Sequence, residues 1–229
     1  MLIYFKKWRE QSGEPAVRTR RRRLLACLPL AAVLGLSASA SAHSAPKTVL
    51  VLGDSLSAEY GLSRGAGWVS LLEQRLKQKN ISANIVNASI SGETTSGGRT
   101  RLPALLKKFK PAVVVVELGA NDGLRGLPAP SAEANLRAIG DQAKSAGAEV
   151  LLVGIRIPPN YGRNYADQIY SMYGKLAKQL NTPLVPFMLE GVADKSQLFQ
   201  ADRLHPLAQA HPIILDNIWP QLLPMLKPR

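Results

Sequence analysis

Short apolar runs alternate with longer amphipathic segments from residue 48 to the end of the chain. Runs such as VVVV and LLV are almost continuously apolar, which is typical of parallel strands that are covered on both faces. This pattern predicts strands at 48–53, 83–90, 112–119, 149–157 and 183–187.

The segments between these runs carry apolar residues at helical spacing. Trp68, Leu71, Leu72 and Leu76 would share one face of a helix over 68–79. Further helices are predicted at 99–109, 131–147 and 165–180, followed by a closing helix, broken by prolines, at 206–226.

Five such alternations in one run predict a single doubly wound sheet, which is an α/β fold. No linker, repeat or low-complexity tract interrupts the chain after Pro46. In such sheets ligands bind outside the carboxyl ends of the strands. We therefore expect the candidate chemistry in the loops that follow the strands.

Two serines stand in motifs typical of hydrolase nucleophiles. Ser63 lies in GLSRG and matches the G-x-S-x-G pattern, but the polar segment SAEY stands where that pattern needs a strand. Ser55 directly follows the apolar run VLVLG, and Gly53 permits a tight turn before it. A serine at this place also suits a helix N-cap. Of the two, Ser55 is the candidate nucleophile.

A serine hydroxyl needs a base to take its proton and a third group to orient that base. Within residues 43–229 the histidines are His43, His205 and His211. His205 follows Asp202 by three residues, so in a turn the carboxylate can hold one imidazole nitrogen while the other faces the serine. Pro206 is expected to start the last helix. His211 has no acid on its helical face, and we interpret it as a surface or packing residue.

Hydrolysis of an acyl bond also needs donors aimed at the developing oxyanion. The loop at 87–98 offers Gly92, whose backbone N–H can approach a substrate closely, and the loop at 117–123 offers the side-chain amide of Asn121. Each loop alone also suits an ordinary turn. Three such loops at strand ends, with Asp-x-x-His near the C-terminus, favour a hydrolase site. Asp54 has no histidine or carboxylate cluster near it, so we predict no metal site.

The first 42 residues predict a secretory signal. The basic stretch VRTRRRR precedes the apolar run LLACLPLAAVLGL and a small-residue A-x-A site. This run is shorter than the roughly 20 residues of a membrane span, and an uncleaved anchor is the alternative. We expect cleavage after Ala42 and one domain over 43–229. Cys27, the only cysteine, leaves with the signal, which excludes disulfides and thiol chemistry from the mature domain.

The formal net charge is +13, and segment 1–42 contributes +6 of it. The remaining surplus permits transient contact with anionic membrane lipid or phosphate-bearing substrates. The lysines are scattered over the predicted helix faces, and no zinc-finger or RNP-like motif accompanies them. A nucleic-acid partner is therefore not predicted.

Four blocks, GDSLS, SISGETTSGG, ELGANDG and DRLHP, follow one another in this order. They resemble the four blocks of the SGNH, or GDSL, hydrolases. The stretches LGDSLSAEYGL, RLPALLKKFKP and IRIPPNYGRNY look closest to the periplasmic acyl-CoA thioesterase I, lysophospholipase and arylesterase branch. The similarity extends from about Thr48 to the C-terminus.

The resemblance implies a three-layer α/β/α, flavodoxin-like sandwich with a five-stranded parallel sheet. It also implies that the protein is located in the periplasm. It implies Ser55 as nucleophile, His205 as general base and then acid, and Asp202 as the residue that orients the imidazole. The oxyanion hole would combine the N–H groups of Ser55 and Gly92 with the Asn121 side chain. No metal or organic cofactor is implied. Substrates of the family include short and medium acyl esters, aryl esters, acyl-CoA thioesters and lysophospholipids.

The loop at 155–165 is expected to lie beside this site. Pro158 stiffens the loop, and Tyr161 and Tyr165 offer apolar faces to an acyl or aromatic group. Leu204 borders His205, where relatives often carry a small or polar residue. These four are the candidate substrate-binding residues, although an ordinary crossover loop is the alternative.

Two other functions stay open at this point. One is a carbohydrate O-acetylesterase that uses the same mechanism. The other is a non-catalytic domain that binds lipid or glycan on the same scaffold. The complete set of triad residues and oxyanion donors argues against the second.

Overall fold

The computed structural model describes residues 45–227, and the predicted signal with its cleavage site after Ala42 lies outside these residues. Five parallel strands form one sheet in the order β2-β1-β3-β4-β5. The strands are β1 (Lys47–Gly53), β2 (Ala83–Asn87), β3 (Val113–Glu117), β4 (Glu149–Val153) and β5 (Leu184–Val185). The helices are α1 (Trp68–Gln78), α2 (Thr95–Phe109), α3 (Ala120–Leu124), α4 (Ala129–Ser145), α5 (Arg163–Gln179) and α6 (His211–Leu226), with short 3₁₀ turns η1 (Pro159–Tyr161), η2 (Ser196–Leu198) and η3 (Ala208–Ala210).

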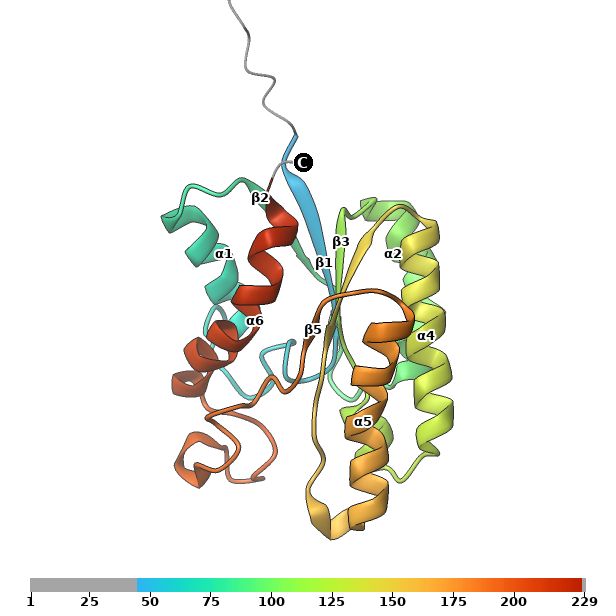
Figure 1. The fold of residues 1–229 in the computed structure, drawn as a ribbon. Coiled ribbons are helices and arrows are strands. Elements are labelled where there is room, and N and C mark those ends of the chain that lie inside the picture. Colours follow the sequence, from blue (N-terminus) through green and yellow to red (C-terminus); the bar gives the residue numbers. More distant parts are fainter. Residues whose placement is uncertain (1–44, 228–229) are drawn as a thin grey trace, which may run out of the picture. The chain divides into compact units, whose positions relative to one another are not determined.

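The helices cover both faces of the sheet. Figure 1 shows α1 and α6 packed together on one side, and α2, α4 and α5 packed on the other. The predicted three-layer α/β/α sandwich with flavodoxin-like strand order is thus confirmed. Within residues 45–227, no helix is both long enough and apolar enough to cross a membrane.

The central strands β1 and β3 form the middle of the core. Val49–Leu52 and Val113–Val116 are fully buried, because both faces of these strands are covered by helices. The apolar run predicted as a strand over 149–157 leaves the sheet after Val153. Ile155 and Ile157 nevertheless stay buried. Their apolar character comes from the cleft that they line, rather than from strand pairing.

Helix α2 begins at Thr95, four residues before the predicted start. The Thr94 side chain caps it by accepting a hydrogen bond from the N–H of Gly97. The first turn contains two glycines, which have low helix propensity, so the sequence did not predict a helix start here. Gly98 is needed for packing, since a Cβ there would lie 2.3 Å from Leu118 Cδ1.

Helix α6 corrects two predictions. It begins at His211 instead of Pro206, which forms an isolated antiparallel bridge with Phe199. It also continues through Pro220 and Pro224 without a break. These prolines are four residues apart on the exposed face, so the carbonyls that they leave unbonded face water.

His211 is a buried packing residue that joins α6 to α1. Its Nδ1 accepts the backbone N–H of Trp68 at 3.0 Å, at a helix start whose N-cap residue, Gly67, has no side chain. Burial lowers the pKa of His211, although the nearby Glu59 charge opposes this shift. The imidazole therefore stays neutral and keeps a lone pair for the N–H.

Replacing His211 by alanine is expected to lower the free energy of unfolding by about 1–3 kcal/mol, because a buried N–H loses its acceptor. Urea titration of both proteins measures this difference. His211→Asn offers a replacement acceptor and is expected to recover part of the loss. Equal midpoints for wild type and His211→Ala would contradict this role.

Candidate active site

The loop after β1 holds Ser55 at the carboxyl end of the strand. The Asp54 carbonyl accepts the N–H groups of Ser57 at 3.3 Å and Ala58 at 3.0 Å, while the Asp54 carboxylate accepts the N–H of Leu56 at 3.0 Å. These bonds form the tight turn that a nucleophile elbow needs. A regular helix does not follow at once, however, since α1 begins only at Trp68.

Ser55, His205 and Asp202 form one chain of hydrogen bonds. The Oγ of Ser55 lies 2.9 Å from Nε2 of His205, across 150 residues of sequence. The Nδ1 of His205 lies 2.6 Å from Oδ2 of Asp202. By contrast, Ser63 lies in an exposed loop, and no described imidazole is within hydrogen-bond distance of its hydroxyl.

The turn at 202–205 orients the carboxylate. Its Oδ1 accepts the backbone N–H groups of Leu204 at 2.9 Å and His205 at 3.0 Å, which leaves Oδ2 for the imidazole. Slight burial acts to raise the pKa of Asp202, but these hydrogen bonds outweigh it and lower the pKa to about 2. Asp202 is therefore ionised at neutral pH and can stabilise an imidazolium.

Two residues that sequence reasoning missed hold the histidine loop against the serine loop. Sequence reasoning assigned no role to Gln200. Its Nε2 donates to the Tyr60 carbonyl at 2.9 Å, and its backbone N–H donates to the His205 carbonyl at 2.8 Å. The Tyr60 ring lies against the His205 ring, with centroids 4.4 Å apart. Neither residue belongs to a motif that signals this contact.

The predicted oxyanion donors differ in whether they already donate a hydrogen bond within the protein. The backbone N–H groups of Ser55 and Gly92 have no hydrogen-bond acceptor among the described residues. Gly92 has a φ of 78°, a conformation that suits glycine. Asn121 lies in the short helix α3, which the sequence did not predict. Its Nδ2 donates to Asp54 Oδ2 at 3.1 Å and to the Glu93 carbonyl at 3.0 Å, so an oxyanion would share one of these hydrogens.

A cleft beside Ser55 is also lined by Asn121 and His205. Of the four predicted substrate-binding residues, Pro158 and Leu204 line it, whereas Tyr161 and Tyr165 do not. The Tyr165 hydroxyl donates to the Leu127 carbonyl at 2.5 Å and thus braces a loop. The apolar wall comprises Leu56, Leu124, Ile155, Ile157 and Leu189, which sequence reasoning did not assign to the site.

A pair of buried carboxyl groups lies beneath the serine. Asp54 and Glu117 are both fully buried, at the carboxyl ends of β1 and β3. The Oε2 of Glu117 accepts the Ser57 hydroxyl at 2.7 Å and the Asp54 N–H at 3.3 Å. Burial raises the pKa of Asp54 to about 6. Burial, and then the charge of Asp54, raise the pKa of Glu117 well above its usual range.

The raised pKa values predict a stability that falls as pH rises. Around pH 4 to 6 the folded protein keeps protons on these carboxyls that the unfolded chain has released, so the free energy of unfolding decreases through this window. Glu117→Gln keeps an acceptor for Ser57 and carries no proton to lose. Its stability, measured by urea unfolding at about pH 4.5 and about pH 7.5, is expected to improve relative to wild type at the higher pH. Parallel pH curves for the two proteins would contradict the assignment.

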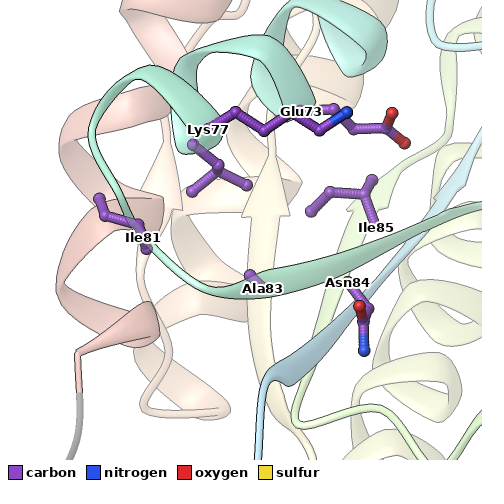
Figure 2. A pocket seen from close by; sticks show the side chains of 7 residues that line it. Glu73, Lys77, Ile81, Ala83, Asn84 and Ile85 are labelled. Atoms are coloured by element: carbon purple, nitrogen blue, oxygen red, sulfur yellow. The ribbon is translucent and has the colours of Figure 1, made fainter.

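Another hollow lies at the sheet edge, between α1 and β2 (Figure 2). Figure 2 shows Glu73 and Lys77 from the helix above Asn84 and Ile85 from the strand. Its lining contains no serine, cysteine or threonine that could act as a nucleophile, and no histidine that could act as the base. The cleft beside Ser55, at the switch point between β1 and β3, is therefore the candidate active site.

Comparison with known proteins indicates the family. Residues 51–213 match the GDSL-like lipase/acylhydrolase family. The chain is 50% identical over 184 residues to the esterase TesA of Pseudomonas aeruginosa, a match that covers 80% of this chain and 92% of that protein. It is 48% identical over 183 residues to thioesterase 1/protease 1/lysophospholipase L1 of Escherichia coli K12, covering 80% and 86%.

A solved structure, that of the psychrotrophic esterase EstA from Pseudoalteromonas sp. inhibited by monoethylphosphonate, matches with a TM-score of 0.75. The identity is 42%, and the match covers 79% of this chain and 98% of that one. The family match, the identities and the shared fold together lead to one conclusion. The chain belongs to the GDSL-like lipase/acylhydrolase family and is a carboxylic-ester hydrolase.

Proposed function

We propose that the protein is an exported serine hydrolase that cleaves acyl esters, aryl esters, acyl-CoA thioesters or lysophospholipids through an acyl-enzyme on Ser55. The observation that carries this proposal is the continuous hydrogen-bond chain from Ser55 Oγ through His205 to Asp202, at the lip of an apolar cleft. A serine, a base and an oriented acid in this order are what nucleophilic acyl transfer needs.

The first half of the reaction follows from this geometry. Ser55 Oγ attacks the acyl carbonyl while its proton passes to His205 Nε2, and the ionised Asp202 stabilises the imidazolium. The unbonded N–H groups of Ser55 and Gly92 suit the developing oxyanion, with Asn121 as the third donor. When the tetrahedral intermediate collapses, His205 returns the proton to the departing alcohol or thiol.

The second half repeats these roles with water. His205 takes a proton from a water molecule, whose oxygen attacks the acyl carbon on Ser55, and the carboxylic acid leaves as Ser55 regains its proton. Support for a covalent step comes from the Pseudoalteromonas esterase, which was solved with monoethylphosphonate as inhibitor. Phosphonates of this kind mimic the tetrahedral intermediate on a serine nucleophile.

The cleft wall supports an acyl substrate. Ile155, Ile157 and Leu189 place apolar carbon beside the nucleophile, and Pro158 and Leu204 extend this surface outward. Each methylene group buried against this wall contributes about 0.8 kcal/mol of binding free energy, which favours an acyl chain over a free sugar. The names of the two relatives, an esterase and a thioesterase 1/lysophospholipase L1, agree with such substrates.

The proposed cellular location is the periplasm. The basic, apolar and small-residue sequence of residues 17–42 has the layout of a cleavable export signal, with cleavage after Ala42. The mature chain would then be one domain over 43–229. N-terminal sequencing of protein purified from a periplasmic extract tests this, and a protein that retains residues 1–42 would contradict it.

Labelling with a fluorophosphonate probe tests the nucleophile. A single adduct is expected on Ser55, mapped by mass spectrometry of the digested protein, and Ser63→Ala should label as fully as wild type. An adduct on Ser63, or none, would contradict the proposal. A panel of p-nitrophenyl acetate and octanoate, an acyl-CoA, a lysophospholipid and an acetylated polysaccharide then separates acyl-chain hydrolysis from the O-acetylesterase alternative.

A further inference from the structure

The loop after β2 turns sharply at Gly92, the glycine predicted to donate its N–H to the oxyanion. The backbone N–H of Glu93 donates to the Ile90 carbonyl at 3.1 Å and closes a β-turn over 90–93. Gly92, the third residue of the turn, has a φ of 78°, whereas Ser91 does not have a positive φ, so the turn is of type II. This turn sets the direction of the Gly92 N–H locally. The position of that N–H relative to the other donors depends on contacts with other loops.

Two side chains, one from the short helix α3 and one from its C-cap, hold this turn. The Arg125 guanidinium donates from Nη2 to the Gly92 carbonyl at 2.7 Å, and the Asn121 amide donates to the Glu93 carbonyl at 3.0 Å. Asn121 and Arg125 are four residues apart and therefore lie on the same face of one helical turn. They thus reach two adjacent carbonyls. Within residues 45–227, no hydrogen bond other than that of Arg125 reaches the Gly92 backbone.

Helix α3 is a fixed base for this contact. The buried Asp122 carboxylate accepts the Thr95 N–H at 2.9 Å and the Thr95 hydroxyl at 2.5 Å, which ties α3 to the start of α2. The Arg125 N–H donates to the Asn121 carbonyl at 3.1 Å and completes the helical turn. Arg125 therefore reaches Gly92 from a segment whose own place is set by buried contacts.

The Arg125 side chain has this one partner. It is exposed, and no carboxylate among the residues that the structure describes forms an ion pair with it. A charged donor makes a short and strong hydrogen bond, which the distance of 2.7 Å fits. A Cβ added to Gly92 would lie 3.5 Å from Nη2, so the guanidinium lies directly against the turn. Sequence reasoning gave Arg125 no role.

We propose that Arg125 is a positioning residue of the oxyanion hole, which keeps the Gly92 N–H aimed at the point where the Ser55 N–H and the Asn121 amide also donate. This inference rests on the proposed function, because Gly92 has an oxyanion to bind only if Ser55 attacks an acyl carbonyl. Donors stabilise an oxyanion strongly only when they are already held at hydrogen-bond distance from its position. Leu124, which directly precedes Arg125, lines the cleft, so the segment that lines the acyl cleft also holds the donor.

Replacing Arg125 by alanine is expected to lower kcat for p-nitrophenyl butyrate roughly 10- to 100-fold, while KM stays within about twofold of wild type. Complete removal of an oxyanion donor costs about 10²- to 10³-fold in kcat, and here the N–H remains but is less well placed. Arg125→Lys retains a cationic donor and is expected to recover most of kcat. Steady-state kinetics of the three proteins measure this pattern, which a loss of substrate binding alone would not give.

The rate of labelling by a fluorophosphonate probe gives a second readout. The phosphonyl oxygen takes the position of the oxyanion as Ser55 attacks the phosphorus. The labelling rate of Arg125→Ala is therefore expected to fall by about the same factor as its kcat.

Salt separates positioning from the bare charge of the guanidinium. An exposed charge that acts through space is screened at about 1 M salt, where the Debye length is about 3 Å. A misplaced N–H is not restored by salt, so the ratio of kcat between wild type and Arg125→Ala is expected to be the same at low salt and at about 1 M salt. A ratio that approaches one at high salt would overturn the positioning role.

Arg99→Gln is the matched control. Arg99 is also exposed and makes one hydrogen bond, from Nη1 to Asn135 Oδ1 at 3.2 Å, but it lies on α2 and does not line the cleft. Its kcat and KM should match those of wild type. The urea midpoints of Arg99→Gln and Arg125→Ala should both lie close to the wild-type value, because neither arginine is buried.

The positioning role and the proposed catalysis can fail separately in this design. Wild-type kcat in Arg125→Ala, an equal loss in Arg99→Gln, or Arg125→Lys no faster than Arg125→Ala would overturn the positioning role and leave the catalysis standing. A loss of kcat in Arg125→Ala that only follows its folded fraction in urea would overturn it too. Absence of Ser55 labelling in the wild type would instead overturn the proposed function.

Discussion

Replacing Ser55 by alanine is expected to reduce kcat for p-nitrophenyl butyrate by about 10⁴- to 10⁶-fold. The structure gives His205 Nε2 one hydroxyl partner within hydrogen-bond distance among the described residues, and that hydroxyl is lost. The N–H groups of the oxyanion hole remain, so a slow hydrolysis by water should persist above the uncatalysed rate. A steady-state assay at high enzyme concentration measures this residue of activity.

The control for this substitution is Ser63→Ala. Ser63 lies in the G-x-S-x-G sequence but in an exposed loop without an imidazole partner, so its loss should leave kcat within about twofold of wild type. The two serines stand in similar motifs, but we expect opposite effects on kcat when each is replaced by alanine. Substantial activity in Ser55→Ala, or a large loss in Ser63→Ala, would reverse the assignment.

Replacing His205 by alanine is expected to be nearly as damaging as the loss of Ser55, because the hydroxyl then has no base. The double variant Ser55→Ala/His205→Ala should be no slower than either single variant, since the two groups act as one unit. Kinetics of all three variants on the same ester measure this non-additivity. If the double variant lost the product of the two single effects, the residues would act independently and the proposed mechanism would fail.

His211→Ala provides the matched control for the histidine. His211 is hydrogen bonded like His205 and is more deeply buried, but its Nδ1 is occupied by the Trp68 N–H and it does not line the cleft. Its loss should therefore lower stability while kcat at a temperature below the unfolding transition stays near the wild-type value. This contrast separates a catalytic histidine from one that only supports the fold.

Local patterning predicted the elements well but their limits less well. The apolar runs at β1 and β3 identify buried parallel strands, since few other structures bury every residue in succession. The start of α2 was missed because Gly97 and Gly98 are poor helix formers, although packing against Leu118 requires the space that Gly98 leaves. The prolines in α6 led to the wrong prediction of a broken helix. Helix propensity does not take into account that both prolines lie on the face exposed to water.

The sequence by itself determined the fold class, the loops that carry polar chemistry and the family, because periodic burial and short motifs are local properties of a chain. Only the tertiary structure decided which groups meet. Distant loops converge at one sheet edge, and four features depend on this convergence. They are the contact between Ser55 and His205, the hydrogen bond from the Asn121 amide to Asp54, the burial of Glu117 and the apolar wall of the cleft. Convergence of this kind is set by long-range packing, which no local pattern of residues encodes.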